Sequence, residues 1–197
     1  MSDQRGFRFQ RIGAIAGIAA PVVGFTCILA AIASYPAFSW TNNALSDLGV
    51  VSGITALTFN FGLFFSGLLS FIFAVCGLWS FLSVSRVGKS GAAIFAAAAI
   101  ALVCIGIFNE HFSPTHYLVS VAFFVLAPIS MFVLTFAFWL KRQRGLAVFT
   151  VLVAVAAALV WVLELTFRYV SGVAVPEALS GVAISIWTIV LAKKMWR

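Results

Sequence analysis

Six long apolar runs divide this chain, and they constrain its fold more than any other feature of the sequence. They lie at about residues 12–34, 53–83, 91–109, 116–140, 145–169 and 176–193. A helix of about 20 apolar residues is long enough to cross the hydrocarbon core of a bilayer. Because lipid offers no partner to an unpaired backbone group, each run is expected to be helical. The sequence therefore predicts an all-α, polytopic membrane protein, with six transmembrane helices in a single bundle and one domain over residues 1–197.

The scarcity of charged residues agrees with a lipid environment. They make up 9% of the 197 residues, and the formal net charge is +7, whereas a soluble domain carries about 25% charged residues. The basic residues stand in small groups at the ends of the runs, not along a stripe that a phosphate backbone could follow. This pattern excludes nucleic acid as a partner and favours membrane lipid. The three cysteines all lie inside apolar runs, which argues against a disulfide framework or a zinc ribbon.

The positions of lysine and arginine predict how the helices are oriented. All of these residues except Arg168 lie before the first run, between the second and third, between the fourth and fifth, or at and beyond the end of the sixth. The positive-inside rule places these segments, and both chain termini, on the cytoplasmic side of the cell membrane. Trp40 and the three tyrosines fall at the opposite ends of the runs, where amphipathic rings favour the membrane interface.

The titratable side chains gather at the ends of the runs that this orientation makes extracytoplasmic. All carboxylates except Asp3, both histidines and Arg168 lie there. We therefore predict an outward-facing polar cavity. Its catalytic or cation-binding groups are predicted to be Asp47, Glu110 and His116. Its substrate-binding and orienting groups are predicted to be Asn60, Ser120, Glu164, Arg168 and Glu177.

Chemical reasoning supports a shared role for Glu110 and His116. Glu110 lies near the C-terminal end of the third run, where a negative charge opposes the helix dipole and needs a partner. His116 and Ser120 are four residues apart and share a helix face. Neighbouring carboxylates and histidines can exchange protons near neutral pH. A divalent metal ion would find ligands in Asp47, Glu110 and His116, although their spacing is not diagnostic, and no other cofactor is expected.

Each candidate also has a structural interpretation. Ser46 or Asp47, which precede the second run, can cap its helix and offset its dipole. Glu177 follows Pro176, which is ordinary chemistry for the start of a helix. Glu164 and Arg168 are one helical turn apart and are expected to form an ion pair, either between helices or within the site.

Two further alternatives remain open at the helix faces. His116 can be an interfacial residue that is hydrogen-bonded to a carbonyl, while His111 is expected in a solvated loop. Gly13 and Gly17 form a GxxxG motif, which indicates close packing within the bundle or, as a weaker alternative, a dimer face.

Four segments resemble a known family of six-span archaeal and bacterial membrane proteins. They are NALSDLG, FNFGLFFSGLL, GIFNEHFSPTHYLVSVAFF and PEALSGVAISIW. The family is catalogued as a domain of unknown function, number 998 (DUF998). Its pattern falls on Ser46, Asp47, Gly49, Asn60, Glu110, His116, Ser120 and Glu177. The resemblance covers nearly the whole chain and implies the fold and a shared polar face, but no activity. This chain departs from the pattern at Asn109, where the family often has proline.

Three functional hypotheses follow, and whether the protein is an enzyme stays open. In the first, the cavity binds a lipid or other amphiphile at the outer leaflet and, in its stronger form, processes it. In the second, the protein is a non-catalytic scaffold that binds a partner, and the polar groups are caps and ion pairs. In the third, it is a proton- or cation-linked transporter. Transporters place polar groups near the bilayer midplane, whereas the charges here are concentrated at one boundary.

Overall fold

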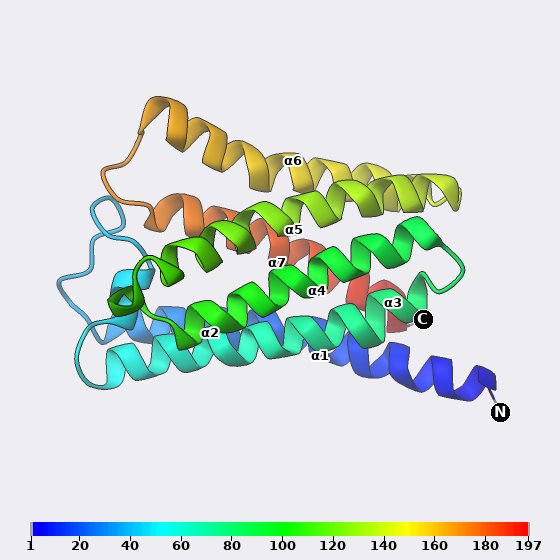
Figure 1. Cartoon of the computed structure of the whole chain (residues 1–197), viewed down its shortest axis with the longest axis horizontal. Coiled ribbons are helices and arrows are strands. Elements are labelled where there is room, and N and C mark those ends of the chain that lie inside the picture. The colour runs from blue at the N-terminus through cyan, green and yellow to red at the C-terminus, as the bar shows by residue number, and fades with distance from the viewer. Residues whose placement is uncertain (1, 197) are drawn as a thin grey trace.

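Six helices in this computed structural model are long and apolar enough to cross a membrane (Figure 1). The structure describes residues 2–196, and side chains from residue 6 onward, so the predicted cytoplasmic groups Arg5 and Arg197 lie outside the described side chains. The spans are α1 (Ser2–Ala33), Ile54–Phe81, α4 (Arg86–Ile107), α5 (Thr115–Leu140), α6 (Arg144–Phe167) and α7 (Ala174–Trp196). No strand occurs in this part of the chain. The predicted all-α fold with six spans is confirmed.

Several helices extend beyond the apolar runs at their basic ends. α1 already includes Arg8 and Arg11, α4 begins at Arg86, and α7 continues through Lys193 to Trp196. Helical hydrogen bonding does not need an apolar environment, and long basic side chains can lay their stems along apolar surface while the charge reaches water. The apolar runs alone therefore underestimate the length of these helices.

The second span is not a continuous α-helix. α2 (Ile54–Ile72) passes into a π-helical segment, η2 (Phe73–Leu78), and then into the short α3 (Trp79–Phe81). Gly77 of η2 lies against Gly13 of α1, where a Cβ added to Gly13 would overlap the Gly77 backbone. Gly17 faces the ring of Phe73 in the same way. The GxxxG motif thus brings two helices of one chain into close contact, as the packing interpretation predicts.

The two ends of the bundle differ. One end, which we call the terminal end, carries both chain termini (Figure 1). The other, the loop end, carries residues 34–53, 108–114 and 168–173, including the short 3₁₀ helices η1 (Ser46–Gly49) and η3 (Glu110–Phe112). Tyr117 and Tyr169 are exposed at the loop end, while Trp79 and Trp139 are exposed at the terminal end. Aromatic side chains therefore border both ends, where the sequence places them.

The first and last helices are neighbours. α1 packs against α2 and α7, α4 against α2 and α5, and α6 against α5 and α7. At the terminal end the Gln10 side chain donates a hydrogen bond to the Met195 carbonyl at 2.8 Å. The Arg11 guanidinium lies 5.5 Å from the Trp196 ring centroid. The six helices therefore close into a ring rather than an open row.

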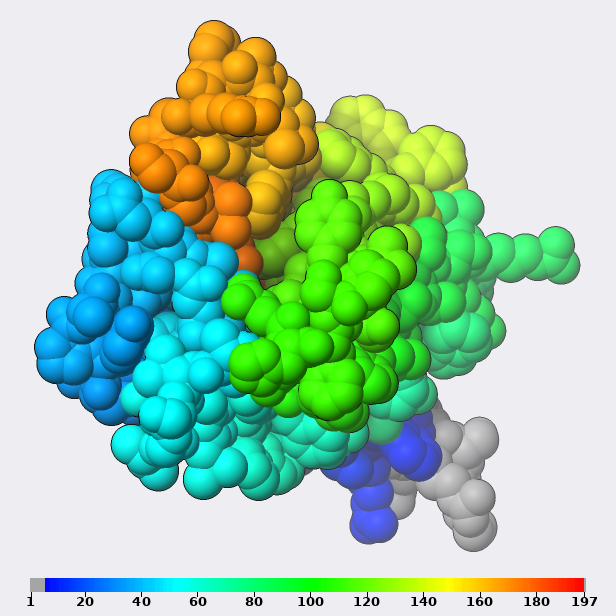
Figure 2. All heavy atoms as spheres, turned by 60° about the vertical axis from the view of Figure 1, so that its left-hand side comes forward, coloured from blue at the N-terminus to red at the C-terminus, as the bar shows by residue number. Residues whose placement is uncertain are grey.

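α6 diverges from the other helices towards the loop end (Figure 1). Figure 2, in which the loop end comes forward, shows a hollow between the end of α6, in gold, and the beginning of α5, in green. The buried side of α6 is formed mostly by small residues, among them Ala147, Ala154 and Ala157. Small side chains let the N-terminal half of α6 lie close to the neighbouring helices.

Backbone hydrogen bonds connect the first loop to the start of α7. The N–H groups of Val173 and Ala174 donate to the Asn43 carbonyl at 3.1 and 2.9 Å, and Gly172 N–H donates to the Thr41 carbonyl at 2.7 Å. The first N–H groups of a helix have no partner within it. The Thr41 and Asn43 carbonyls satisfy three N–H groups at or just before the start of α7. The loop between α1 and α2 therefore holds α7 in place.

Two apolar clusters form the core. The larger fills the half near the terminal end and is centred on residues such as Phe73, Met131 and Trp187. The smaller lies at the loop end and includes Leu48 and Phe59. Side chains from both clusters border an internal cavity, so the packing is interrupted between them.

Candidate functional site

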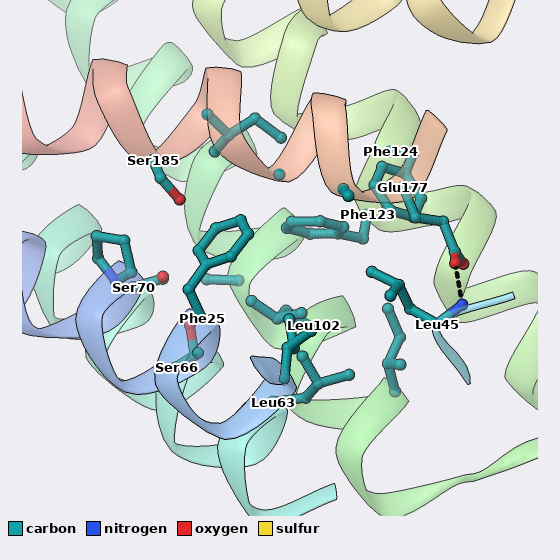
Figure 3. A pocket seen from close by; sticks show the side chains of 18 of the residues that line it. Phe25, Leu45, Leu63, Ser66, Ser70, Leu102, Phe123, Phe124, Glu177 and Ser185 are labelled. Atoms are coloured by element: carbon teal, nitrogen blue, oxygen red, sulfur yellow. Dashed lines mark hydrogen bonds between the residues drawn. The ribbon is translucent and has the colours of Figure 1, made fainter. Parts of the chain in front are cut away.

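A cavity of about 110 Å³ lies within the loop-end half of the bundle. It is enclosed by α1, α2, α4, α5 and α7, with part of the first loop at its end (Figure 3). Most of its lining is apolar and includes Phe25, Ile28, Leu63, Leu102, Phe123 and Phe124. A mostly apolar hollow with a few polar groups is the usual form of a small-molecule site.

Glu177 provides an acidic side chain at the loop end of this cavity. It lies in the first turn of α7, where the helix dipole favours a negative charge. Its Oε2 atom accepts a hydrogen bond from the backbone N–H of Leu45 at 2.6 Å (Figure 3). Ser46, the first residue of η1, also lines this end. A short hydrogen bond to a carboxylate is among the stronger ones in proteins, so it fixes the first loop over the cavity.

Asp47 holds the first loop together. Its Oδ2 atom accepts hydrogen bonds from the Asn43 side chain at 2.6 Å and from the Ala44 N–H at 3.1 Å. It does not cap the second span, because α2 is preceded by Gly53, with φ of 84° and no side-chain cap. The capping interpretation of Asp47 is therefore wrong. Asp47 cannot reach the start of α2 because several loop residues lie between them, and its carboxylate points back to Asn43 and Ala44.

His116 connects the end of α4 to the beginning of α5. The ring is buried, with 8% of the residue exposed, and Nδ1 lies 2.7 Å from the Phe108 carbonyl oxygen. Because a carbonyl can only accept, Nδ1 carries the proton. Nε2 lies 3.5 Å from the Ser120 hydroxyl, which confirms that these two residues share a helix face. The hydrogen bond to a carbonyl is the one that the structural interpretation predicts.

Asn60 belongs to a separate, open groove beside the start of α2. Its side-chain amide donates to the Gly49 carbonyl at 2.9 Å, and Asn109 donates to the same carbonyl at 3.3 Å. Both residues and His111 line the groove. The Asn60 Oδ1 atom is buried without a hydrogen-bond partner. Asn109, where the chain departs from the family pattern, therefore helps to hold the loops together.

The predicted catalytic groups do not line the cavity. Asp47, Glu110 and His116 are absent from its lining, whereas Ser120 and Glu177 of the predicted orienting groups are part of it. The segment η1, which contains Asp47, contacts η3, which begins at Glu110. Within the part of the chain that the structure describes, no three His, Cys, Asp or Glu side chains are grouped as metal ligands would be.

Glu164 and Arg168 do not form the predicted ion pair. Glu164 is 6% exposed, and its Oε2 atom has no hydrogen-bond partner. Arg168 is exposed, because α6 ends at Phe167 and Arg168 leaves the helix with φ of 46°. The expected pairing assumes that both residues belong to one helix, and that condition is not met. Burial and then the charge of Glu164 raise the pKa of the nearby Tyr169 hydroxyl.

Sequence reasoning missed most of the residues that line the cavity. Phe25, Phe123 and Phe124 are among many aromatic residues in the apolar runs, and nothing in their spacing separates a cavity wall from a lipid-facing surface. Ser70 and Ser185 also line the cavity. The sequence does indicate these two residues, because a serine in the middle of an apolar span needs a hydrogen-bond partner.

Comparison with known proteins gives a family and no individual relative. A family model described as "Protein of unknown function (DUF998)" matches residues 18–194. No curated protein and no solved structure matches the chain.

Proposed function

Because this chain belongs to the DUF998 family of proteins of unknown function, we propose its function from the cavity itself: it binds a membrane amphiphile. The apolar part of the ligand occupies the cavity, and its polar group lies at the Glu177 end. The supporting observation is the mostly apolar cavity of about 110 Å³ with one carboxylate at its loop end. The proposal locates the ligand at the outer leaflet, as the positive-inside rule orients the chain.

The free energy of packing supports occupation of this cavity. An unfilled cavity costs roughly 24 cal/mol per Å³ in protein cores, which gives a cost on the order of 2–3 kcal/mol here. A hydrocarbon chain from the surrounding bilayer restores the missing van der Waals contacts. Apolar surface by itself does not favour the protein over lipid, because lipid tails are equally apolar. Polar contacts at the ends of the cavity must therefore decide which amphiphile is held.

The polar contacts favour reversible binding over chemical processing. Glu177 faces the cavity, but Asp47 and His116 are engaged in loop and helix-end hydrogen bonds outside it. An acid–base group must come within hydrogen-bond reach of the atom on which it acts. We therefore place the amphiphile-binding hypothesis ahead of turnover.

The other two hypotheses fit less of the geometry. A scaffold accounts for the hydrogen bonds of Asp47 and His116, but not for an internal cavity. A transporter accounts for a cavity that reaches the middle of the bundle, but the larger apolar cluster fills the half beyond it. Substrate flux into liposomes driven by a pH gradient is the measurement that would favour transport.

Photolabelling tests the proposal directly. The full-length protein is reconstituted into liposomes with a diazirine-bearing fatty alcohol, irradiated, and mapped by peptide mass spectrometry. Ala99 lines the cavity, and Ala97 is exposed on the same helix. We expect Ala99→Phe, which fills the cavity, to lower labelling of the lining residues about tenfold, corresponding to about 1.4 kcal/mol.

Ala97→Phe is the matched control, because it adds the same ring to the lipid-facing side of α4. It is expected to label like the wild type. Equal labelling of the lining in wild type and Ala99→Phe, or labelling confined to lipid-facing residues, would overturn the proposal.

A further inference from the structure

Two serines near the middle of the bundle have hydroxyl groups that face the cavity. Ser70 lies near the midpoint of the span Ile54–Phe81, and Ser185 near the midpoint of α7. In Figure 3 they lie at one end of the lining and Glu177 at the other. Neither hydroxyl has a hydrogen-bond partner among residues 6–196, and the cavity is the space next to them.

Three other hydroxyl groups in the spans are paired with backbone carbonyls. Ser66 donates to the Ala20 carbonyl at 2.9 Å, Ser130 to the Gly91 carbonyl at 2.8 Å, and Thr188 to the Ile184 carbonyl at 2.8 Å. Such bonds to backbone carbonyls are the usual way in which a helix accommodates serine and threonine in an apolar environment. Ser70 and Ser185 are therefore available to a ligand, and a hydroxyl left unpaired in hydrocarbon is unfavourable.

The polar groups at the two ends of the cavity are separated by a defined length. Ser185 lies eight positions after Glu177 on α7. At a rise of 1.5 Å per residue this separation is about 12 Å along the helix axis. An extended alkyl chain of about that length connects the two ends, so one ligand can reach the carboxylate and the serine hydroxyls together.

We infer that the cavity selects a bipolar amphiphile, with one polar group at Glu177 and a second hydroxyl or carbonyl that hydrogen-bonds to Ser70 and Ser185. This inference rests on the proposed binding function and specifies its ligand. A serine hydroxyl both donates and accepts, so it suits either group. Ordinary lipid chains carry no such group at this depth and cannot satisfy the serines. The second polar group of such a ligand is unpaired in the bilayer interior, which is unfavourable, but it is hydrogen-bonded in the cavity. This difference lets the protein select the bipolar amphiphile over ordinary lipid.

A pair of simple compounds tests the inference. In nanodiscs holding the full chain and the photoreactive fatty alcohol, 1-decanol and 1,10-decanediol are compared as competitors. The two compounds partition differently into the bilayer. The concentration of each compound that displaces half of the probe is therefore compared between protein variants, not between compounds. We expect the Ser70→Ala/Ser185→Ala double variant to need about tenfold more diol for half-displacement, with decanol changed less than about twofold.

Ser130→Ala is the matched control, because Ser130 also lies within a span but does not line the cavity, and its hydroxyl is bonded to the Gly91 carbonyl. It is expected to leave both competition curves unchanged. Ser185→Thr, which keeps a hydroxyl, is expected to retain the diol preference. Displacement by both compounds that is the same in wild type and double variant would overturn the inference and leave the binding proposal standing. Failure of both compounds to displace the probe from the wild type would overturn the two together.

Discussion

His116 is a titratable residue whose contacts serve the fold. Its Nδ1 donates to the carbonyl of Phe108, the residue that directly follows α4. Carbonyls at the C-terminal end of a helix have no partner within the helix, so a side chain or water must supply one. The imidazole supplies the donor from the first turn of α5 and connects the two helices across their turn.

Substitution of His116 distinguishes this structural role from a catalytic one. His116→Ala leaves a carbonyl in a buried position without a donor, and we expect the free energy of unfolding to fall by about 1–3 kcal/mol. His116→Asn keeps a side-chain N–H close to the position of Nδ1 and is expected to recover most of that loss. Thermal unfolding of the purified variants in one detergent provides the measurement. Equal stability of His116→Ala and wild type would contradict the assigned hydrogen bond.

The sequence predicts the depth of the polar residues but not their partners. Depth follows from position along a helix, which is why Glu110 and Glu177 are correctly expected at one end. Partners depend on how loops fold over that end. Asp47 turns back to Asn43, and Asn60 reaches the Gly49 carbonyl, and both contacts are set by the path of residues 34–53. No periodicity describes such a path.

At the scale of helices, the contact of α1 with η2 depends on two glycines. Gly13 and Gly77 allow the backbones to approach where any Cβ on Gly13 would overlap the opposite chain. The π-helical turn at Phe73–Leu78 brings Gly77 to this position. Hydropathy reports only that the span is apolar, so it predicts the span and misses the π-helical turn within it.

Two glycine-to-alanine substitutions test this contact. Gly13→Ala is expected to lower the free energy of unfolding by about 1–3 kcal/mol, because the helices must separate or shift. Gly145, in the first turn of α6, has nothing within 4 Å of an added Cβ. Gly145→Ala is therefore expected to be neutral or stabilising by up to about 1 kcal/mol. Denaturation of both variants under the same conditions gives the comparison, and similar effects at the two sites would contradict the close contact.

At the scale of the whole molecule, the number of spans is predictable and the cavity is not. Every apolar run long enough to cross a membrane became a helix, because a spanning segment has few other ways to pair its backbone. The position of the cavity depends on which apolar side chains face one another after packing. Phe123 and the exposed Val125 look equivalent in sequence, but only Phe123 lines the cavity.

The orientation of the bundle is a prediction that labelling in intact cells can test. Ser171 is exposed at the loop end, and Ser83 is exposed at the terminal end. With a membrane-impermeant maleimide, we expect Ser171→Cys to react in intact cells and Ser83→Cys to react only after permeabilisation. The wild-type protein, whose three cysteines all lie within spans, measures the background. The reverse pattern would place the termini outside.

The contact between α1 and α7 has a consequence for biogenesis. A ribosome delivers α1 to the translocon first and α7 last, so the side of α1 that packs against α7 stays uncovered until the last helix has been made. The hydrogen bonds between residues 41–43 and 172–174 likewise form only after nearly all of the chain has been inserted. A nascent chain halted after α6 therefore lacks one wall of the bundle, and the cavity that α7 helps to enclose stays open.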